Sequence, residues 1–574
     1  MNYQDTYQEW ITNPYFDEAT KEELKAIAGD DKEIKERFYS DLAFGTAGLR
    51  GIIGAGINRM NIYVVRKATQ GLADYILSQN TDKKRVAIAF DSRHMSTEFA
   101  DEAARCLAAN GIKAFVFDAL RPTPELSFAV RQLECIAGIN ITASHNPPAY
   151  NGYKVYWEDG AQFTPPHDKG VTACVNAITD ISKVKTMSQE EAKAAGLYEV
   201  IGAAIDDAYI AEVKKQVLNQ GAIDEMASKL KIVYTPLHGT GNIPVRRVLD
   251  ELGFKNVYVV PEQELPDGDF PTVSYPNPEA KEAFELGLAL AKEKDADLVL
   301  ATDPDADRLG VYVKDTKSGE YISLTGNMSG SLLGEYVLSQ KKAKAGNLPA
   351  DGAVVKSIVT TNLVDAVAEN YGVKLIEVLT GFKFIGQQML NFEKTGKGTY
   401  LFGLEESYGC LIGTYARDKD AVSATVALCE AAAYYATQGK TLWDVMTEMY
   451  DKYGYYLDKI ISLEFAGLDG AEKIKSMIEN FRANPPKVIG GLKVLKARDY
   501  GKDTILDIAT GDVTPTGLPN SNVLYYELEN DAWLCVRPSG TEPKIKFYYG
   551  TKGATMEEAQ AVSAKIEEWA SEYK

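Results

Sequence analysis

The sequence predicts an α/β protein of three similar domains with mixed, largely parallel sheets, followed by a smaller C-terminal α+β domain. Its 574 residues correspond to about four domains at roughly 150 residues each. After residue 40 a pattern recurs, in which a β-branched run ends in a Gly, Pro, Asp or Ser cluster and a helical stretch follows. Apolar strands that alternate with helices are typical of buried, mostly parallel sheets. The runs form three sets, at 85–93, 113–124 and 135–147, then 231–241, 257–263 and 296–308, then 353–362, 373–381 and 398–409.

The two ends of the chain differ from these sets. Residues 1–40 are charged and helix-like, and a final helix is expected to begin near Thr555. Three strand-like segments lie close together after the Pro/Gly-rich stretch 483–491, which predicts an antiparallel sheet: residues 522–530, 532–538 and 544–550. We therefore expect four domains, at residues 1–205, 206–318, 319–450 and 451–574.

The charge balance limits the partners. Lys plus Arg number 62 and Asp plus Glu number 81, so the net charge is −19 and the pI is about 4.9. This balance argues against nucleic-acid binding, which needs a broad basic surface. A local basic pocket can still bind a small anion inside an acidic protein. We therefore expect a small-molecule partner.

Cysteine usage and hydropathy indicate the compartment. The six cysteines are scattered without a CxxC pair, which predicts reduced thiols and no disulfide framework. The four histidines are scattered too, which argues against a zinc site. The N-terminus has no signal-peptide pattern. The most apolar helical stretch, 421–436, contains Glu430 and is too short to span a membrane. We expect a cytoplasmic protein with no membrane partner.

The motif TASHNP, residues 142–147, follows a predicted strand and contains Ser144. A Ser before His145, Asn146 and Pro147 is expected on an exposed turn. An isolated Ser-His pair is most often only a capped turn, and the GxSxG motif of serine hydrolases is absent. Ser144 would be a plausible nucleophile if the group that it accepts is a phosphoryl group and a metal ion is bound nearby.

The motif ATDPDADRLG, residues 301–310, supplies candidate metal ligands. Asp303, Asp305 and Asp307 alternate along an expected extended loop, so their carboxylates point to one side. Three oxygen ligands favour Mg²⁺ or Ca²⁺. An EF-hand is excluded because Arg308 stands where Gly is required and Lys314 where Glu is required. The motif predicts a cation site, beside which Arg308 can neutralise a phosphoryl group.

Other loops at strand ends carry polar side chains. In GTAGLRG, residues 45–51, backbone N–H groups and Arg50 could bind a phosphate. A dinucleotide loop is excluded there because Arg59 occupies the position of the third Gly. Three further motifs carry residues that suit sugar hydroxyls or phosphate: Glu405 with Ser407 in GLEESYG, Lys383 in TGFKFIG, and Arg537, Ser539, Gly540 and Thr541 in RPSGTEPK.

Taken together, these motifs resemble those of the α-D-phosphohexomutase superfamily, in particular its bacterial phosphoglucomutases. The resemblance covers nearly the whole chain, and the motifs occur in the family's order: FGTAGLRG, TASHNP, NGYK, DPDADR, TGFKF, EESYG and RPSGTEP. Two points depart from it. Ala47 stands where many members have Ser, and the charged segment 159–197 matches no family motif. The resemblance implies four domains around a central cleft.

The resemblance also implies roles for the matching residues. Ser144 would carry the phosphoryl group, and its phosphate would hold Mg²⁺ together with Asp303, Asp305 and Asp307. The residues expected around the transferring group are Arg50, His145, Lys154 and Arg308. Those expected at the sugar are Gly381, Lys383, Glu405 and Ser407. Those expected at the non-transferring phosphate are Arg537, Ser539, Gly540 and Thr541.

The expected reaction is the interconversion of glucose 1-phosphate and glucose 6-phosphate through glucose 1,6-bisphosphate, by an isomerase that uses Mg²⁺. Alternatives with the same chemistry are a phosphomannomutase, a phosphopentomutase and a glucose-1,6-bisphosphate synthase. A non-catalytic sugar-phosphate sensor would be expected to lack Ser144 or one of the aspartates, and all are present. A Mg²⁺-dependent phosphatase would need no second phosphate site, so RPSGTEPK argues against it.

Overall fold

The computed structural model of the chain describes residues 2–45, 48–465, 470–539 and 544–573. The chain divides into two compact units. The first comprises Met1–Thr325, Phe382–Lys397 and Ser407–Gly439. The second comprises Gly326–Gly381, Gly398–Glu406 and Lys440–Lys574, so residues 319–450 contribute to both units.

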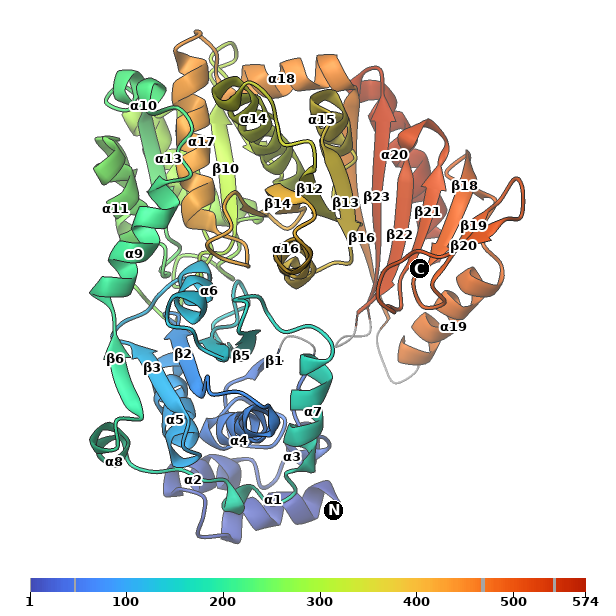
Figure 1. The fold of residues 1–574 in the computed structure, drawn as a ribbon. Helices are drawn as coiled ribbons and strands as arrows, with labels where there is room; N and C mark the ends of the chain where they lie inside the picture. The colour runs from blue at the N-terminus through green and yellow to red at the C-terminus, as the bar shows by residue number, and fades with distance from the viewer. Residues whose placement is uncertain (1, 46–47, 466–469, 540–543, 574) are drawn as a thin grey trace. The chain divides into compact units, whose positions relative to one another are not determined.

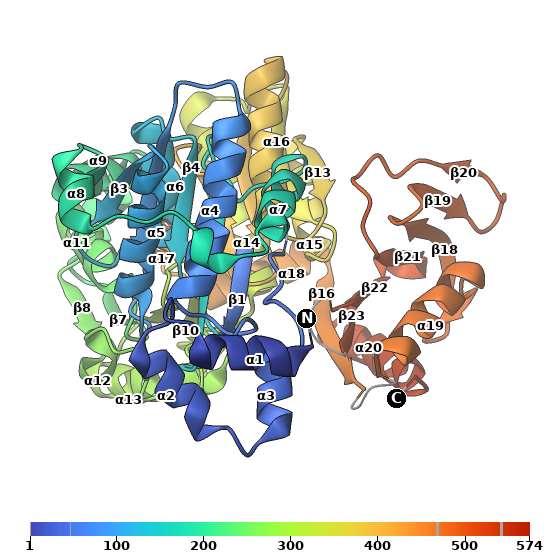
Figure 2. The same cartoon turned by 90° about the horizontal axis from the view of Figure 1, so that it is seen from below.

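The first unit begins with three short helices, as expected from the charged N-terminal sequence: α1 (Tyr3–Thr12), α2 (Glu18–Ala26) and α3 (Asp31–Phe38). Each begins where a polar side chain accepts a hydrogen bond from the first turn, at Asn2, Asp17 and Asp30 respectively. Their apolar faces share an aromatic core in which Trp10 stacks on Phe16. The three helices lie next to one another in Figure 2.

A six-stranded mixed sheet follows, in the order β1-β5-β4-β2-β3-β6. Strands β4, β2, β3 and β6 are parallel; β5 pairs antiparallel with β4, and the edge strand β1 pairs antiparallel with β5. Helices α4, α5 and α7 share one core with these strands, and α6 packs against β2 and β4. The strands are β1 (Gly48–Ile52), β2 (Arg85–Phe90), β3 (Lys113–Phe117), β4 (Ala137–Ile141), β5 (Tyr150–Trp157) and β6 (Tyr198–Ile201). The helices are α4 (Ile62–Ser78), α5 (Ser96–Ala109), α6 (Thr123–Gln132), α7 (His167–Ala177), η1 (Ile181–Lys183) and α8 (Gln189–Ala194).

The second sheet of the first unit repeats this plan, in the order β11-β10-β9-β7-β8. Strands β9, β7 and β8 are parallel; β10 pairs antiparallel with β9, and the edge strand β11 pairs antiparallel with β10. The strands are β7 (Lys231–Thr235), β8 (Asn256–Val259), β9 (Leu298–Thr302), β10 (Leu309–Lys314) and β11 (Tyr321–Leu324). The helices are α9 (Ala203–Lys214), α10 (Gln220–Met226), α11 (Asn242–Leu252), α12 (Pro261–Glu264), η2 (Lys281–Phe284) and α13 (Glu285–Lys294).

The two sheets place their polar loops at equivalent positions. Residues 142–147 follow parallel strand β4 and lead to antiparallel strand β5, and residues 303–308 follow parallel strand β9 and lead to antiparallel strand β10. Each loop therefore leaves the carboxyl end of a central parallel strand, where α/β sheets bind ligands. Three later elements also belong to the first unit: α16 (Phe382–Thr395), β15 (Gly409–Leu411) and α17 (Ala421–Ala436).

The second unit contains the parallel strands β13, β12 and β14, in that order. Helix α14 packs against β14 and α15, and α18 packs against α14 and α15 (Figure 1). The elements are α14 (Gly326–Ala345), β12 (Gly352–Ser357), α15 (Leu363–Tyr371), β13 (Lys374–Val378), β14 (Thr399–Glu405) and α18 (Leu442–Tyr453).

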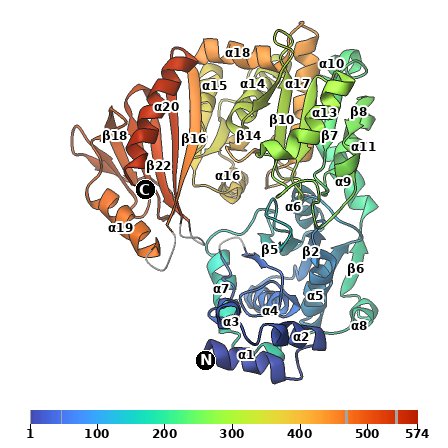
Figure 3. The same cartoon turned by 180° about the vertical axis from the view of Figure 1, so that it is seen from behind.

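The rest of the second unit is an antiparallel sheet, in the order β16-β23-β22-β21-β18-β19-β20 with β17 paired to β18. Helices α19 and α20 pack against this sheet and share one core with it; α20 lies in front of the strands in Figure 3. The strands are β16 (Tyr455–Glu464), β17 (Val488–Ile489), β18 (Leu492–Asp499), β19 (Thr504–Asp507), β20 (Val513–Thr514), β21 (Leu524–Leu528), β22 (Trp533–Pro538) and β23 (Lys544–Gly553). The helices are α19 (Gly470–Ala483), η3 (Glu529–Asp531) and α20 (Met556–Ser571).

These sheets confirm the predicted fold class of three α/β parts with mixed, largely parallel sheets and a C-terminal α+β part. All six cysteines are free, as the scattered sequence positions predicted. Within the described residues, the structure has no helix that is both long and apolar enough to cross a bilayer. The apolar stretch 421–436 is helix α17, which begins because Asp420 accepts hydrogen bonds from the first turn.

Candidate active site

The first unit brings Ser144 against the three aspartates. Ser144 Oγ donates a hydrogen bond to Asp303 Oδ2 at 2.8 Å, and the serine side chain is buried. Its backbone adopts the left-handed region at φ 51°, which is uncommon for a residue with a side chain. Two loops that sequence alone could only describe separately therefore meet at one hydrogen bond.

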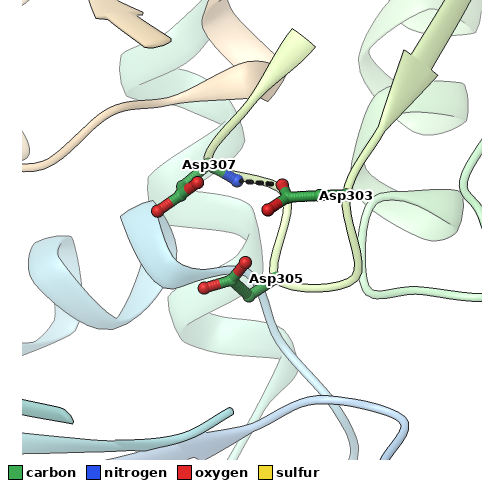
Figure 4. Close-up of side chains that lie close together, drawn as sticks. All are labelled: Asp303, Asp305 and Asp307. Carbon is green, nitrogen blue, oxygen red and sulfur yellow. Dashed lines mark hydrogen bonds between the residues drawn. The ribbon is translucent and has the colours of Figure 1, made fainter. Parts of the chain in front are cut away.

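Asp303, Asp305 and Asp307 are buried, and one oxygen of each lies within 4.8 Å of those of the other two (Figure 4). Asp303 Oδ1 accepts hydrogen bonds from the backbone N–H groups of Asp307 and Arg308, both at 3.1 Å, which fixes the loop. Asp305 Oδ1 and Asp307 Oδ1 are buried and accept no hydrogen bond from the described residues. Buried carboxylate oxygens without donors suit a hard cation, so the donor set fits Mg²⁺.

The loop of residues 303–308, which we call the metal loop, is supported by two other segments of the first unit. Thr123 Oγ donates to Asp305 Oδ2 at 2.8 Å, and Thr240 N donates to the carbonyl oxygen of Pro304 at 2.8 Å. Gly239 is required beside it, because a Cβ there would lie 2.4 Å from Cα of Pro304. Thr123 and Gly239 lie at the ends of the strand runs 113–124 and 231–241, but the sequence analysis named neither as a candidate site residue.

Two lysines face the carboxylates. Lys154 Nζ donates to Asp305 Oδ2 at 2.7 Å and lies 3.9 Å from Asp307 Oδ2. Lys419 Nζ lies 3.0 Å from Asp307 Oδ2, and its side chain is buried. Lys154 was a predicted site residue. Lys419 was missed, and the only sequence signal for it is its place in the charged run RDKD, residues 417–420.

The other predicted residues of this loop region lie close by. His145 Nδ1 is 3.2 Å from Ser144 Oγ. Burial, followed by the positive charges of Arg308 and Arg50, lowers the pKa of His145 to about 2, so its imidazole is neutral near pH 7. Arg50 Nη1 donates to Asn146 Oδ1 at 2.9 Å, in the same loop as Ser144.

Arg308 and Ser407 are placed at the edges of the metal loop. Arg308 Nη1 donates to Glu279 Oε1 at 2.6 Å, and its Nε lies 3.7 Å from Asp307 Oδ1. The carbonyl oxygen of Tyr408 accepts a hydrogen bond from Leu309 N at 2.9 Å, so Ser407 is one residue from a direct contact with the end of this loop. Lys383, on α16 in the first unit, is partly buried, and burial lowers its pKa.

The second unit holds the other predicted residues. Glu405 is buried and its Oε1 accepts a hydrogen bond from Gly381 N at 2.7 Å, so two predicted sugar-binding residues are in contact. Arg537 is exposed on β22, and Ser539 N donates to the carbonyl oxygen of Lys544 at 2.8 Å. Gly540 and Thr541 lie outside the described residues.

Family models match three successive segments of the chain, at residues 41–182, 207–319 and 325–453. Their descriptions are phosphoglucomutase/phosphomannomutase, alpha/beta/alpha domains I, II and III. The chain belongs to the phosphoglucomutase/phosphomannomutase family, within the α-D-phosphohexomutase superfamily. It is therefore an enzyme, an isomerase of the phosphohexomutase type.

Relatives of the family match most of the chain. A phosphoglucomutase of Staphylococcus saprophyticus is 38% identical over 92% of this chain and 94% of its own length. A phosphoglucomutase of Staphylococcus aureus (strain MSSA476) is 37% identical over 93% of this chain and 94% of its own length.

Solved structures share the fold. Parafusin (phosphoglucomutase) from Paramecium, in its open form, has a TM-score of 0.69 at 19% identity, over 93% of this chain and 95% of that chain. A phosphoglucomutase/phosphomannomutase family protein from Burkholderia thailandensis has a TM-score of 0.64 at 19% identity, over 93% and 98%. At 19% identity these two structures support the fold of the chain alone.

Proposed function

We propose that this enzyme is a phosphoglucomutase that interconverts glucose 1-phosphate and glucose 6-phosphate through phosphoserine at Ser144. The observation that carries the proposal is the hydrogen bond from the buried Ser144 Oγ to Asp303 in a cluster of three carboxylates. A hydroxyl beside a cation site has the arrangement that a phosphoryl carrier needs. The phosphoglucomutases at 37–38% identity support glucose as the sugar.

In the proposed cycle, phospho-Ser144 transfers its phosphoryl group to the free hydroxyl of the sugar monophosphate. The P–O bond to Ser144 Oγ breaks as a P–O bond to the sugar oxygen forms. In this first transfer a nearby base takes the hydroxyl proton and the departing Ser144 Oγ takes up a proton; in the second transfer Ser144 Oγ gives up its proton and the departing sugar oxygen takes one up. Glucose 1,6-bisphosphate is the intermediate, and its other phosphoryl group returns to Ser144. The sum is an isomerisation in which no phosphate is gained or lost.

We propose Mg²⁺ as the cofactor, held by Asp303, Asp305 and Asp307 together with the Ser144 phosphate. When bound, the cation would withdraw electron density from the phosphoryl oxygens. Phosphoryl transfer has a loose transition state, so the protein contributes mainly positioning and charge stabilisation. The residues to which we assign that charge stabilisation are Arg50, His145, Lys154 and Arg308.

The remaining assignments concern the rest of the substrate. Gly381, Lys383, Glu405 and Ser407 would bind sugar hydroxyls, and the contact between Glu405 and Gly381 supports a shared role for those two. Arg537, Ser539, Gly540 and Thr541 would bind the phosphate that is not transferred. Each proposed domain, 1–205, 206–318, 319–450 and 451–574, would thus supply one loop: serine, metal, sugar and phosphate, respectively.

We also propose a cytoplasmic location and sugar phosphates as the partners. Six free cysteines, five of them buried, are what a protein kept in a reducing compartment contains.

Two measurements test this function. Intact mass after incubation with glucose 1,6-bisphosphate should show one added phosphate on the wild type and none on Ser144→Ala. Because no other group would carry the phosphoryl, that variant should lose turnover by roughly 10⁴-fold or more while keeping its melting temperature. Turnover should be compared on glucose, mannose, glucosamine and ribose 1-phosphates, and a preference for any sugar but glucose would refute the assignment of glucose.

A further inference from the structure

The side chain of Arg93 is buried beneath the serine loop, which we define as residues 142–147. Its Nη2 donates hydrogen bonds to the carbonyl oxygens of Ser144 at 2.6 Å and Asn146 at 2.5 Å. Its Nη1 donates to the carbonyl oxygens of Pro147 at 2.9 Å and Tyr150 at 3.0 Å. One guanidinium thus binds three carbonyl groups of the serine loop and that of Tyr150, the first residue of β5, and Arg93 is only 3% exposed.

Asp91 binds the same loop from its other end. Asp91 Oδ2 accepts a hydrogen bond from Thr142 Oγ at 2.6 Å, and Thr142 Oγ accepts one from Ser144 N at 2.8 Å. Asp91 Oδ1 accepts from the backbone N–H of Arg93 and from Ser96 Oγ, both at 3.0 Å. Asp91 also lies 3.3 Å from Arg93 Nε, so the two charges compensate each other where both are buried.

These contacts explain how Ser144 keeps an unfavourable backbone conformation. A residue with a side chain adopts a positive φ only when its surroundings determine the conformation more strongly than the strain opposes it. The N–H of Ser144 is bound through Thr142 and its carbonyl oxygen is bound by Arg93. Both peptide groups of Ser144 are therefore fixed, and this directs Oγ toward Asp303.

Arg93 also contacts the part of the first unit that carries the metal loop. Its guanidinium lies over the ring of Phe270, 5.0 Å from the centroid, and the adjacent His94 Nε2 lies 2.7 Å from Asp269 Oδ1. Phe270 is buried in the core of the second sheet. Arg93 therefore lies between the serine loop on one sheet and the core of the sheet that carries Asp303.

We propose that Asp91 and Arg93 are positioning residues for phosphoryl transfer: they hold the serine loop in the one conformation that points Ser144 Oγ at the metal loop. The inference rests on the proposed function of Ser144. Neither residue is expected to touch substrate. A displacement of a reacting atom by about 1 Å can cost on the order of 100-fold in rate, so loosening the loop should reduce transfer far more than substrate binding.

The test uses the full-length protein and measures the rate at which Ser144 is phosphorylated by glucose 1,6-bisphosphate, by quenched intact mass. Arg93→Lys keeps the charge but cannot bind four carbonyl groups, and it should slow phosphorylation about 100-fold. Thr142→Val keeps the shape of the side chain and removes the link between Asp91 and Ser144 N. It should slow phosphorylation about tenfold. In both variants the KM for glucose 1-phosphate should stay within about threefold of wild type, because the substitutions impair phosphoryl transfer and not substrate binding.

A matched control separates positioning from stability. Arg66 makes a bidentate pair with Glu102, at 2.7 and 3.1 Å, in the same domain but between helices α4 and α5. Arg66→Met should lower the melting temperature and leave the rate of phosphorylation unchanged. In Arg93→Ala, added guanidinium should restore part of the phosphorylation rate, which a purely structural role does not predict.

The outcomes for the inference and for the proposed function are distinct. If the wild type is phosphorylated and Arg93→Lys and Thr142→Val are phosphorylated equally fast, the positioning role is refuted and the proposed function stands. The positioning role is also refuted if Arg93→Lys, Thr142→Val and Arg93→Ala lose phosphorylation rate only in proportion to the fraction of protein that is no longer folded. If the wild type is never phosphorylated, the proposed function is refuted and the inference with it.

Discussion

Lys419, the residue before the capping Asp420 of α17, places its Nζ 3.0 Å from Oδ2 of Asp307 in the metal loop. Residue 419 lies beyond the matched domain II segment, within the matched domain III segment. A cation from one repeat of the family thus enters the carboxylate cluster of another, and this contact lies within the first unit.

Lys419→Met should change metal affinity and turnover in opposite directions. Removal of the ammonium leaves Asp307 with one less cation, so Mg²⁺ should bind several-fold more tightly. Turnover should fall about 10- to 100-fold, because a positive charge beside the reacting loop is lost. Calorimetric titration with Mg²⁺ and steady-state kinetics check the two effects. Lys214→Met, which removes an exposed partner of Glu251, is the control and should change neither. Weaker Mg²⁺ binding in Lys419→Met would contradict this account.

Removal of the metal should abolish activity reversibly. Exhaustive chelation should reduce turnover to background, and added Mg²⁺ should restore it. Asp305→Asn keeps acceptors for Thr123 and Lys154 but removes one anionic ligand, and it should reduce turnover on the order of 100-fold or more. Asp224→Asn, on the exposed face of α10, is the matched control. Activity that survives chelation would exclude a metal role for the cluster.

The site could be predicted from sequence where its residues are neighbours in the chain. Asp303, Asp305 and Asp307 alternate within one loop, so their spacing alone brought the carboxylates together. Thr123 and Lys419 reach the same loop from distant elements, and no local spacing indicates such a contact. The same limit applies to Asp91 and Arg93. The run 85–93 correctly predicted strand β2, but nothing in it indicated the hydrogen bonds that these two residues make just after the strand ends.

The fold was predicted for a similar reason. Alternation of apolar strands with helices is a local pattern, and it identified three parallel strands in each of the three α/β sheets but not the parallel strand β6. The direction of the antiparallel strands β5 and β10 has no separate signal, because it depends on the strand with which each one pairs. The division of residues 319–450 between two units likewise depends on long-range packing.

A pH-dependent stability is expected from Asp458 on β16 in the second unit. Burial raises the pKa of this carboxyl to about 7, further helped by the nearby carboxylates Asp365 and Glu406, and opposed by Thr361 and Lys356. Its Oδ1 is buried and has no hydrogen-bond partner among the described residues. Between about pH 4 and 7 the folded state therefore binds this proton and the unfolded state does not.

It follows that the free energy of unfolding should decrease as the pH rises from about 4 to about 7 and should not change further through this group. Asp458→Asn is neutral throughout and should lack this slope. Its stability relative to wild type should therefore increase from pH 4.5 to 7.5, by up to about 4 kcal/mol. Melting temperatures and urea midpoints across this range measure the effect. If the difference in the free energy of unfolding between wild type and Asp458→Asn were the same at pH 4.5 and 7.5, Asp458 would not titrate in this range.

The last prediction concerns Arg537, which is exposed at the end of β22 in the second unit. A guanidinium at the end of a strand, next to Ser539, is suited to bidentate binding of a phosphate. If Arg537 binds the phosphate that is not transferred, both monophosphates and the bisphosphate intermediate depend on it. Arg537→Ala should then weaken every substrate by about 30- to 1,000-fold, equivalent to about 2–4 kcal/mol. Arg537→Lys should rescue only part of the loss, because an ammonium cannot form the two parallel hydrogen bonds.

The same variant should also release the intermediate before its second phosphoryl transfer. Each release leaves Ser144 without phosphate, so the reaction should need more added glucose 1,6-bisphosphate. The deciding measurement is the concentration of this activator at half-maximal rate, in wild type and in Arg537→Ala. Lys496→Ala, which removes an exposed lysine 3.7 Å from Glu527 in the same sheet, should leave that concentration unchanged. An unchanged activator requirement with unchanged KM in Arg537→Ala would mean that RPSGTEPK only connects β22 to β23.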